Sequence, residues 1–152
     1  MATTEKTESC KYVIKQIAVF SENKPGRLTA IAKGLKEADV NIYAFSIAES
    51  NGFGVVRLIV DKSSATLKKL TADGFLVINS NVIGIKMEDR PGGLYETALI
   101  LGDAGINIDY AYAYSGKNGA ILIIRVNDDN LDTAVKSLLK GGKELVRAEE
   151  CM

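Results

Sequence analysis

The stretch Asn23-Lys24-Pro25-Gly26-Arg27-Leu28 decides the fold, because the chain repeats it as Asp89-Arg90-Pro91-Gly92-Gly93-Leu94. The two prolines are 66 positions apart, and the same spacing separates Asn41-Ile42 from Asn107-Ile108. Each copy of the stretch follows an apolar run and precedes a pattern with the period of an amphipathic helix. The sequence therefore predicts a duplicated unit, with the repeated loop between a strand and a helix in each copy.

Both copies predict the same order of elements. Strands are expected at residues 12–20, 42–49, 53–60 and 75–79 of the first copy, and its helices are expected to begin near Asn23-Pro25 and at Ser63. Asn23 is expected near the N-cap and Pro25 in the first helical turn. The second copy is expected to begin with a strand at 81–87 and a helix at 94–104, and to end with a strand at 144–148.

This order, β-α-β-β-α-β twice, predicts an α+β fold of two ferredoxin-like units, each an antiparallel sheet with its helices on one face. We expect a disordered tail at residues 1–11, a first domain at 12–79 and a second at 80–150. Only about one residue, Ser80, connects the last strand of the first domain to the first strand of the second. So short a connection is expected to bring the two sheets into close contact. The helix residues expected to face the core are Leu28, Ile31, Ala32, Leu35 and Ala38, and their counterparts Leu94, Thr97, Ala98, Leu101 and Ala104.

Composition excludes several classes of function. The chain of 152 residues has 19 basic and 19 acidic residues, so its charge gives no reason to expect nucleic acid or an anionic membrane as partner. It has no apolar run of the roughly 18 to 20 residues that a membrane helix needs, and its polar start is unlike a secretory signal, so we expect a cytoplasmic protein. Histidine is absent, which removes the commonest general base and metal ligand. We therefore expect no enzyme, no metal site and no cofactor.

Two groups of residues admit more than one interpretation. Cys10 and Cys151 are expected to be free thiols near the chain ends, with a bridge or redox pair as the alternative. Tyr110, Tyr112 and Tyr114 alternate along a predicted strand, so they share one face of the sheet. That face is expected to be packed or covered by a partner, with ligand stacking as the alternative.

Two groups of charges are expected to be structural. Asp128, Asp129 and Asp132 surround a predicted helix start, where carboxylates are favoured by the helix dipole, so we do not assign a metal to them. Lys136, Lys140 and Lys143 are expected to form a solvated face of the last helix.

The repeated loop carries the chemistry that suits a ligand. A helix start presents three or four amide hydrogens without intrahelical partners and about half a positive charge, which together favour a carboxylate or phosphate. Gly26 and the pair Gly92-Gly93 let a ligand approach this backbone. Asn23 and Asn41 add amide side chains that both donate and accept hydrogen bonds.

Together, the loop pattern N-x-P-G-x-L, an amphipathic helix, a V-N-I segment and a glycine-containing hairpin resemble the ACT domain, a small-molecule-sensing module of amino-acid metabolism. The resemblance covers residues 15–148, with KPGRLTAIAKGLKEADVNI as the better copy and RPGGLYETALILGDAGINI as the second. It implies ferredoxin-like units packed side by side, with amino acids bound at the seam between units.

The serine-sensing ACT pattern implies which residues bind the ligand. It places one asparagine two residues before the loop proline and another in the N-I pair, which correspond to Asn23 and Asn41 and, in the second copy, to Asp89 and Asn107. Where that pattern has histidine, this chain has Ser21 and Met87, so serine is not assigned as the ligand. The expected ligand-binding residues are Asn23, Lys24, Pro25, Gly26, Arg27, Leu28, Asn41, Ile42, Asp89, Arg90, Pro91, Gly92, Gly93, Leu94, Asn107 and Ile108.

Two hypotheses for the function follow. The first is a non-catalytic regulatory sensor, expected to be a homodimer, that binds a free amino acid at the seam and reports it to an enzyme of amino-acid metabolism or to its own oligomer. The alternative is a ligand-free interaction subunit of such an enzyme. The second copy has Asp89 where the first has Asn23, and Gly93 where the first has Arg27. These differences predict that the two loop sites are unequal.

Overall fold

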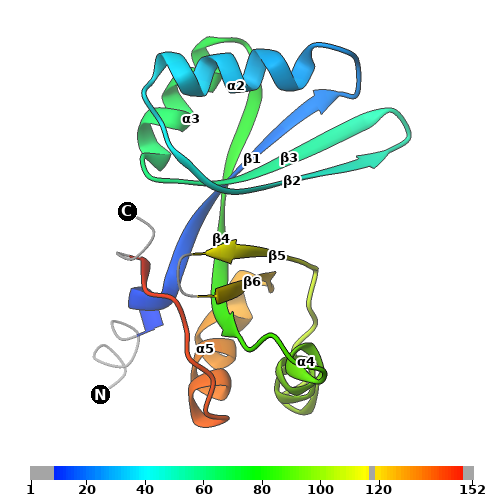
Figure 1. The fold of residues 1–152 in the computed structure, drawn as a ribbon, viewed down its shortest axis with the longest axis vertical. Helices are drawn as coiled ribbons and strands as arrows, with labels where there is room; N and C mark the ends of the chain where they lie inside the picture. The colour runs from blue at the N-terminus through cyan, green and yellow to red at the C-terminus, as the bar shows by residue number, and fades with distance from the viewer. Residues whose placement is uncertain (1–8, 117–118, 149–152) are drawn as a thin grey trace. The chain divides into compact units, whose positions relative to one another are not determined.

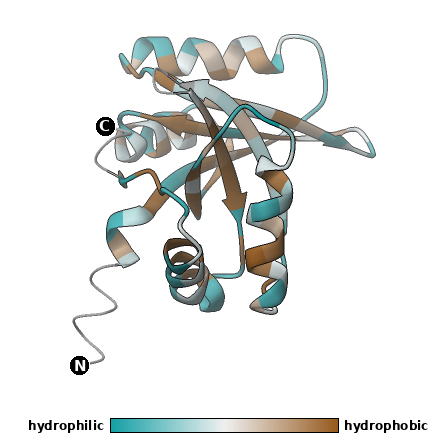
Figure 2. Cartoon of the chain, turned by 60° about the horizontal axis from the view of Figure 1, so that its bottom comes forward, coloured by the Kyte–Doolittle hydropathy of each residue, from teal (hydrophilic) through white to brown (hydrophobic). Residues whose placement is uncertain are grey.

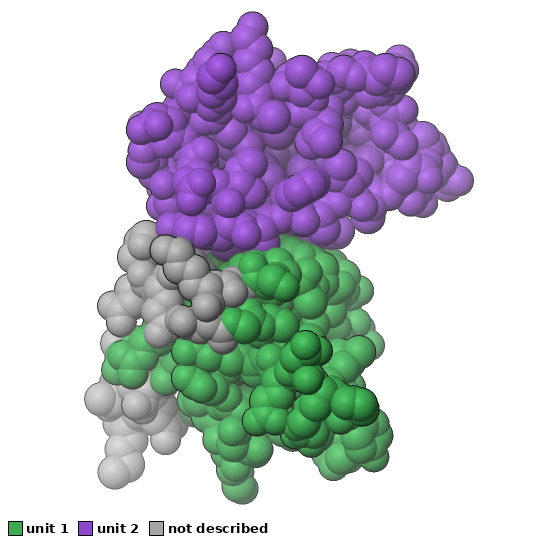
Figure 3. Space-filling model, in the orientation of Figure 1, with its two compact units in different colours: residues 1–14, 81–150 green, residues 15–80, 151–152 purple. Residues whose placement is uncertain are grey.

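The computed structural model describes residues 9–116 and 119–148. The chain divides into two compact units, one built on residues 15–80 and the other on residues 9–14 and 81–148 (Figure 3). The predicted tail falls largely on residues 1–8, outside the described residues, as does Cys151; Cys10–Tyr12 form a short 3-10 helix, η1. No helix in the described ranges is long and apolar enough to cross a bilayer.

The unit of residues 15–80 has two helices on one side of its strands (Figure 1). Its strands lie in the order β2-β3-β1-β4, in which β3 pairs antiparallel with both β1 and β2. This is the predicted ferredoxin-like arrangement. The elements are β1 (Val13–Glu22), α2 (Arg27–Glu37), β2 (Ile42–Ser50), β3 (Phe53–Val60), α3 (Ser63–Ala72) and the first part of β4 (Leu76–Met87).

The second unit repeats this arrangement. The later part of β4 pairs antiparallel with β6, which pairs antiparallel with β5. On the other side of β4, the strand predicted at 144–148 is reduced to a single bridge between Ile85 and Leu145. The other elements of this unit are α4 (Gly93–Asp103), β5 (Tyr110–Gly116), β6 (Gly119–Arg125), the 3-10 helix η2 (Asp128–Asn130) and α5 (Leu131–Lys140).

The strands predicted separately at 75–79 and 81–87 are one continuous strand, β4. The polar residues Asn79, Ser80 and Asn81 indicated a break between domains. Side-chain polarity does not interrupt extended backbone, since strand geometry requires only acceptable dihedrals and a neighbouring strand. β4 therefore ends one copy of the repeat and begins the next.

Each unit buries its own core between helices and sheet. Figure 2 shows the strands as largely hydrophobic and the helices as mixed along their length. The core of the first unit is formed by Ile17, Val19, Ile31, Leu35, Val56, Leu58, Val60 and Leu70. The core of the second unit is formed by Ile83, Ile85, Leu101, Ile106, Leu122, Ile124, Val126, Leu131, Ala134, Val135, Leu138 and Leu145.

The buried stripe of the first helix in each unit is narrower than predicted. In α2 it consists of Ile31, Gly34 and Leu35, while Leu28 is 43% exposed. In α4, likewise, Leu94 is 58% exposed. Ala32 and Ala98 are exposed as well. In α4 the buried residues are Gly93, Thr97 and Leu101. The leucines and alanines therefore lie beside the buried stripe, and both copies present a leucine to solvent next to the repeated loop.

Candidate functional site

The two repeated loops have the same backbone structure. In the first, the Arg27 amide donates to the Lys24 carbonyl at 3.3 Å, and Gly26 has φ +87°. In the second, the Gly93 amide donates to the Arg90 carbonyl at 3.4 Å, and Gly92 has φ +99°. Proline followed by a glycine at positive φ, closed by this hydrogen bond, is a type II turn. The two sequence copies therefore specify one local geometry.

The helix N-cap differs from the prediction. Gly26 and Gly92 occupy the N-cap positions, and neither helix start has a side-chain cap. Asn23 instead donates its backbone amide to the Gly52 carbonyl at 2.8 Å. Pro25 lies in the turn before α2 and not in its first turn, because the type II turn places proline two residues before the helix. The Asn23 side chain is thus left available beside the loop.

Both helix starts present open amides. In α2 the Ala30 amide donates to the Gly26 carbonyl, and in α4 the Glu96 amide donates to the Gly92 carbonyl. These are the first backbone hydrogen bonds of each helix after the bond that closes the turn. Within the part of the chain that the structure describes, the amides of Leu28 and Thr29, and of Leu94 and Tyr95, have no backbone acceptor. Such amides at a positive helix end suit an anion.

The Asn-Ile pairs lie at the far ends of the same helices. Asn41 follows α2 and exchanges hydrogen bonds with Asp61, through its amide to Asp61 Oδ1 at 3.0 Å and its carbonyl to the Asp61 amide at 3.1 Å. Asn107 donates from Nδ2 to Asp109 Oδ1 at 3.2 Å. An 11-residue helix is about 16 Å long. Within one unit, the asparagine therefore does not reach the loop at the start of the same helix. Ile42 and Ile108 lie next to these asparagines, also at the far helix ends.

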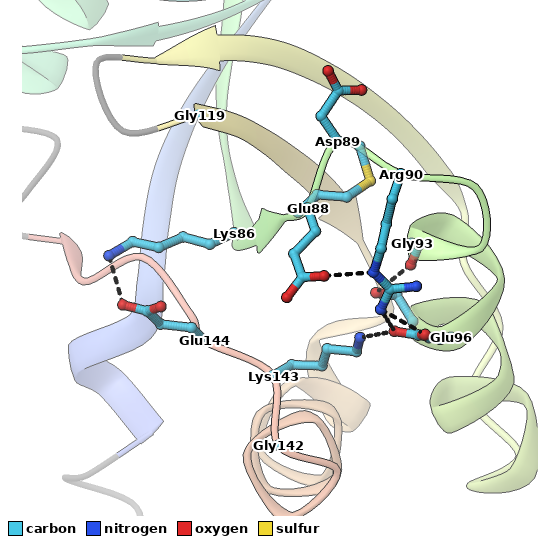
Figure 4. Close-up of a pocket in the computed structure, with 12 residues that line it drawn as sticks. Lys86, Glu88, Asp89, Arg90, Gly93, Glu96, Gly119, Gly142, Lys143 and Glu144 are labelled. Carbon is cyan, nitrogen blue, oxygen red and sulfur yellow. Dashed lines mark hydrogen bonds and ion pairs between the residues drawn. The ribbon is translucent and has the colours of Figure 1, made fainter.

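A cavity of about 510 Å³ lies beside the second loop, between the end of β4, the start of α4 and the segment after α5 (Figure 4). Three predicted ligand residues line it: Asp89, Arg90 and Gly93. The prediction missed its other charged residues, which are Lys86, Glu88, Glu96, Lys143 and Glu144.

On one side of the cavity, Glu96 forms ion pairs with two residues, Arg90 and Lys143. Its carboxylate accepts from Lys143 Nζ at 2.6 Å and from Arg90 Nη2 at 2.8 Å, and Arg90 also contacts Glu88 (Figure 4). Lys143 was predicted on a solvated helix face, but α5 ends at Lys140 and the Lys143 side chain is only 19% exposed. A turn after the helix redirects this residue toward α4, which helical periodicity does not reveal.

The ion pairs shift the titration of these groups. The hydrogen bonds from Lys143 and then Arg90 lower the pKa of Glu96 to about 2, and Glu88 and Glu96 raise the pKa of Arg90. On the opposite wall, Lys86 Nζ lies 2.8 Å from Glu144 Oε1. Asp89 points away from the Glu96 network (Figure 4) and makes no ion pair within the described residues.

Acid should weaken the fold partly through Glu96. Because its pKa is about 2 when folded and about 4.5 when unfolded, its stabilising contribution is present above pH 4.5 and is lost as the pH falls toward 2. We expect the melting temperature of the wild type to fall more steeply over this range than that of Glu96→Gln. Circular dichroism melts at pH 7 to 2 measure this difference. Salt at 1 M should shrink it, since exposed pairs are screened, whereas parallel curves at low salt would contradict it.

Gly93 and Met87 explain one difference between the copies. A Cβ on Gly93 would lie 3.1 Å from the Glu88 carbonyl oxygen and 3.2 Å from Met87 Cγ. In the first copy Ser21 stands at the position of Met87, and Arg27 stands at that of Gly93. The smaller side chain at 21 is thus paired with the larger one at 27. This sequence difference between the two loops therefore has a packing basis in the second copy.

The register decides which face of the sheet carries the tyrosines. Ala113 pairs with Leu122, which belongs to the core under the helices, whereas Tyr112 pairs with Ile123. Since side chains alternate, Tyr110, Tyr112 and Tyr114 lie on the face turned away from α4 and α5.

Within the described residues, no cluster of cysteine, aspartate or glutamate side chains is able to hold a metal ion.

Comparison with known proteins identifies a family model. A model described as an ACT domain pair matches residues 12–152. A search of curated proteins finds no match. Protein BT0572 of Bacteroides thetaiotaomicron is 33% identical, the alignment covers 92% of this chain and 96% of that one, and the TM-score is 0.85.

Two further solved structures share the fold at low identity. The regulatory subunit of aspartate kinase from Thermus thermophilus has 13% identity and a TM-score of 0.63, with 87% of this chain and 95% of that one covered. Aspartate kinase from Clostridium acetobutylicum has 13% identity and a TM-score of 0.53, with 86% of this chain and 33% of that one covered. These likenesses show a common fold.

Proposed function

The chain belongs to the ACT domain family, as an ACT domain pair, and on this premise we propose that it is a non-catalytic regulatory protein that binds a free amino acid. ACT domains are small-molecule-sensing modules of amino-acid metabolism. One structural neighbour is the regulatory subunit of an aspartate kinase. This neighbour supports the proposal that the partner is an enzyme of amino-acid metabolism.

The observation that carries the proposal is the repetition of one loop geometry at both helix starts. An α-carboxylate would accept hydrogen bonds from the open amides of Leu28 and Thr29, where the helix dipole favours negative charge. Asn23 lies beside this loop, and its side chain has no partner within the described residues. Its carbonyl oxygen would accept from the ammonium group of the same ligand.

The second loop would bind more weakly to a carboxylate. It has the same open amides at Leu94 and Tyr95, but Asp89 replaces Asn23 and Gly93 replaces Arg27. Asp89 attracts an ammonium and repels a carboxylate, and the cation of Arg27 has no counterpart there. The two loops would therefore have different affinities or different ligands.

Asn41 and Asn107 would reach a ligand at a loop only from another ACT unit, since each lies at the far end of its own helix. A homodimer would provide additional units. A ligand held by two units would change how firmly they associate, and a coupling of about 1 to 3 kcal/mol is enough for regulation. This is the proposed basis of signalling to the partner enzyme.

The combined substitution Asn23→Ala/Asn41→Ala is expected to remove the stabilisation that the amino acid contributes at the first loop. At 100 times Kd a ligand stabilises the folded state by about 2.7 kcal/mol, roughly 5 to 10 °C in melting temperature for a chain of this size. A thermal shift screen of the proteinogenic amino acids at millimolar concentration should identify the ligand on the wild type. The variant should melt normally without ligand and show at most the smaller shift that the second loop supports.

Lys36→Ala, an exposed change on α2, is the matched control and should keep the full shift. The proposal fails if no proteinogenic amino acid shifts the wild type. A full shift that survives in the double variant would contradict binding at the first loop.

The alternative, a ligand-free interaction subunit, is favoured by one observation. Along the edge strand β2 and its hairpin, Phe45, Ile47 and Phe53 are 56%, 47% and 63% exposed. Large exposed apolar groups at a sheet edge mark a surface that associates with another protein. This alternative predicts association with an enzyme that is unaffected by amino acids and by Asn23→Ala.

A further inference from the structure

The hairpin of β2 and β3 (Figure 1) turns at Asn51-Gly52. Asn51 has φ +52° and Gly52 has φ +84°, and Ser50 pairs with Phe53 across the turn. Two central residues at positive φ define a type I′ turn, in which asparagine followed by glycine is a favoured pair. The turn geometry therefore accounts for both residues, but it does not account for the carboxylate that contacts them.

That carboxylate belongs to Glu49, and it accepts a hydrogen bond from the Gly52 amide at 2.7 Å. The amide proton lies in the plane of the peptide group, whereas the nitrogen forms a new bond through electron density above that plane. Glu49 can therefore take the proton while the nitrogen attacks a carbonyl carbon. Glycine leaves this nitrogen unshielded, since it has no Cβ, and all three residues at 49, 51 and 52 are exposed to water. A carboxylate held in this way is placed as a general base.

The second copy contains the same dipeptide without the carboxylate. Asn118-Gly119 stands between β5 and β6, and the residue three positions before Gly119 is Gly116, where Glu49 stands before Gly52. Asn118 lies outside the described residues, so this comparison is one of sequence. The chain thus offers an internal reference, an asparagine-glycine pair without a glutamate at that position.

The first hairpin also contacts the first repeated loop. The Gly52 carbonyl accepts a hydrogen bond from the Asn23 amide at 2.8 Å. This bond continues the pairing of β1 with β3, in which Glu22 lies opposite Phe53. A change in the length of the backbone at Asn51 would displace the Gly52 carbonyl and with it the bond that fixes the backbone of Asn23.

We propose that Asn51 is a self-modification site, at which Glu49 assists conversion of the asparagine to aspartate and isoaspartate. The Gly52 nitrogen bonds to Asn51 Cγ as its proton passes to Glu49. The side-chain nitrogen of Asn51 then takes that proton and leaves as ammonia, which gives a five-membered succinimide and restores the carboxylate. One water molecule opens this ring. Opening at Cγ gives aspartate, and opening at the main-chain carbonyl carbon gives isoaspartate.

The two products affect the hairpin differently. Both carry a negative charge in place of the neutral amide. Isoaspartate also adds one carbon atom to the backbone, so the two-residue loop no longer matches the type I′ geometry that joins β2 to β3. The bond between the Asn23 amide and the Gly52 carbonyl is therefore lost in the isoaspartate form, and the first repeated loop is released at that point.

Mass spectrometry of tryptic peptides from the full chain, sampled over time at neutral pH, measures the reaction. Trypsin separates Asn51, in residues 37–57, from Asn118, in residues 118–125. We expect Asn51 to convert faster than Asn118. Glu49→Gln, a conservative change of an exposed side chain, should slow conversion at Asn51 by about tenfold or more, as loss of a positioned general base does. It should leave the rate at Asn118 unchanged, and in the urea-unfolded chain it should change neither rate.

An equal or faster rate at Asn51 in Glu49→Gln would overturn the proposal, because the hydrogen bond would then restrain the amide instead of activating it. Conversion of the wild type no faster at Asn51 than at Asn118 would overturn it as well. Both readouts are made without an amino-acid ligand, so their outcome is independent of whether the repeated loops bind one.

Amide NMR of the converted protein tests the link to the loop. The isoaspartate form should lose the wild-type signal of the Asn23 amide. Asn51→Gly cannot react and still suits a type I′ turn, so it should keep that signal after the same storage. Asn51→Asp adds the charge without lengthening the backbone and should keep it too. An unchanged Asn23 signal in the isoaspartate form would contradict the link between hairpin and loop.

Discussion

Leu101→Ala is expected to lower the free energy of unfolding by about 2 to 5 kcal/mol, as removal of a fully buried leucine side chain does. Leu101 is 0% exposed in α4, where it joins the core of the second unit. The lost methyl groups would leave a cavity that the surrounding strands and α5 fill only in part. Chemical denaturation followed by circular dichroism measures the change.

Leu99→Ala is the matched control, because Leu99 lies on the same helix and is 45% exposed. Its replacement should change the stability by less than about 1 kcal/mol. Similar losses for the two variants would contradict the assignment of the buried face of α4. Because α4 carries the second loop at its start, the Leu101 variant should also lose ligand binding at temperatures where this unit unfolds.

Gly34→Ile is expected to destabilise the first unit by about 1 to 3 kcal/mol through overpacking. A Cβ on Gly34 would lie 2.8 Å from Asp73 Oδ2 and 3.0 Å from Leu70 Cδ2. The second copy has the opposite distribution of size, with Ile100 at the position of Gly34 and Gly141 at that of Asp73; a Cβ on Gly141 would lie 2.5 Å from Ile100 Cδ1. In each unit one helix supplies a glycine and the other a larger side chain. The glycine is on the first helix in the first unit and follows the second helix in the second unit.

A double-mutant cycle tests this interpretation. Adding Asp73→Gly to Gly34→Ile copies the second unit and should recover part of the lost stability, with a coupling of about 0.5 to 3 kcal/mol. Gly102→Ala is the control of opposite sign: a Cβ there meets nothing within 4 Å, so the substitution should stabilise α4 by roughly 0.5 to 1 kcal/mol. Additive effects of the two changes at 34 and 73 would show that the positions do not share a contact.

Much of the fold follows from the sequence because the repeat supplies each prediction twice. The strand Phe53–Val60 has the predicted bounds, and the ferredoxin-like order of both units is confirmed. The continuity of β4 was missed, since polar side chains at 79–81 resemble a boundary although the backbone remains a strand through them. The first-turn leucines were assigned to the core, because helical periodicity does not say how wide the buried stripe is.

The candidate site was predictable only where it is local in sequence. The proline-glycine turns are encoded by adjacent residues, so both loops were identified. The cavity depends on the pairing of Glu96 with Lys143, 47 positions apart, and each of these residues alone is an ordinary surface charge. Comparing the copies residue by residue gives the one available signal: Ala30 and Phe75 stand where these charges occur.

The most direct measurement is an amide NMR titration of the ¹⁵N-labelled chain with the amino acids. If the proposed function holds, at least one of them causes saturable shifts, largest at the open amides of Leu28 and Thr29 or of Leu94 and Tyr95. If none shifts these four amides at ten millimolar, the claim that the repeated loops bind an amino acid is contradicted.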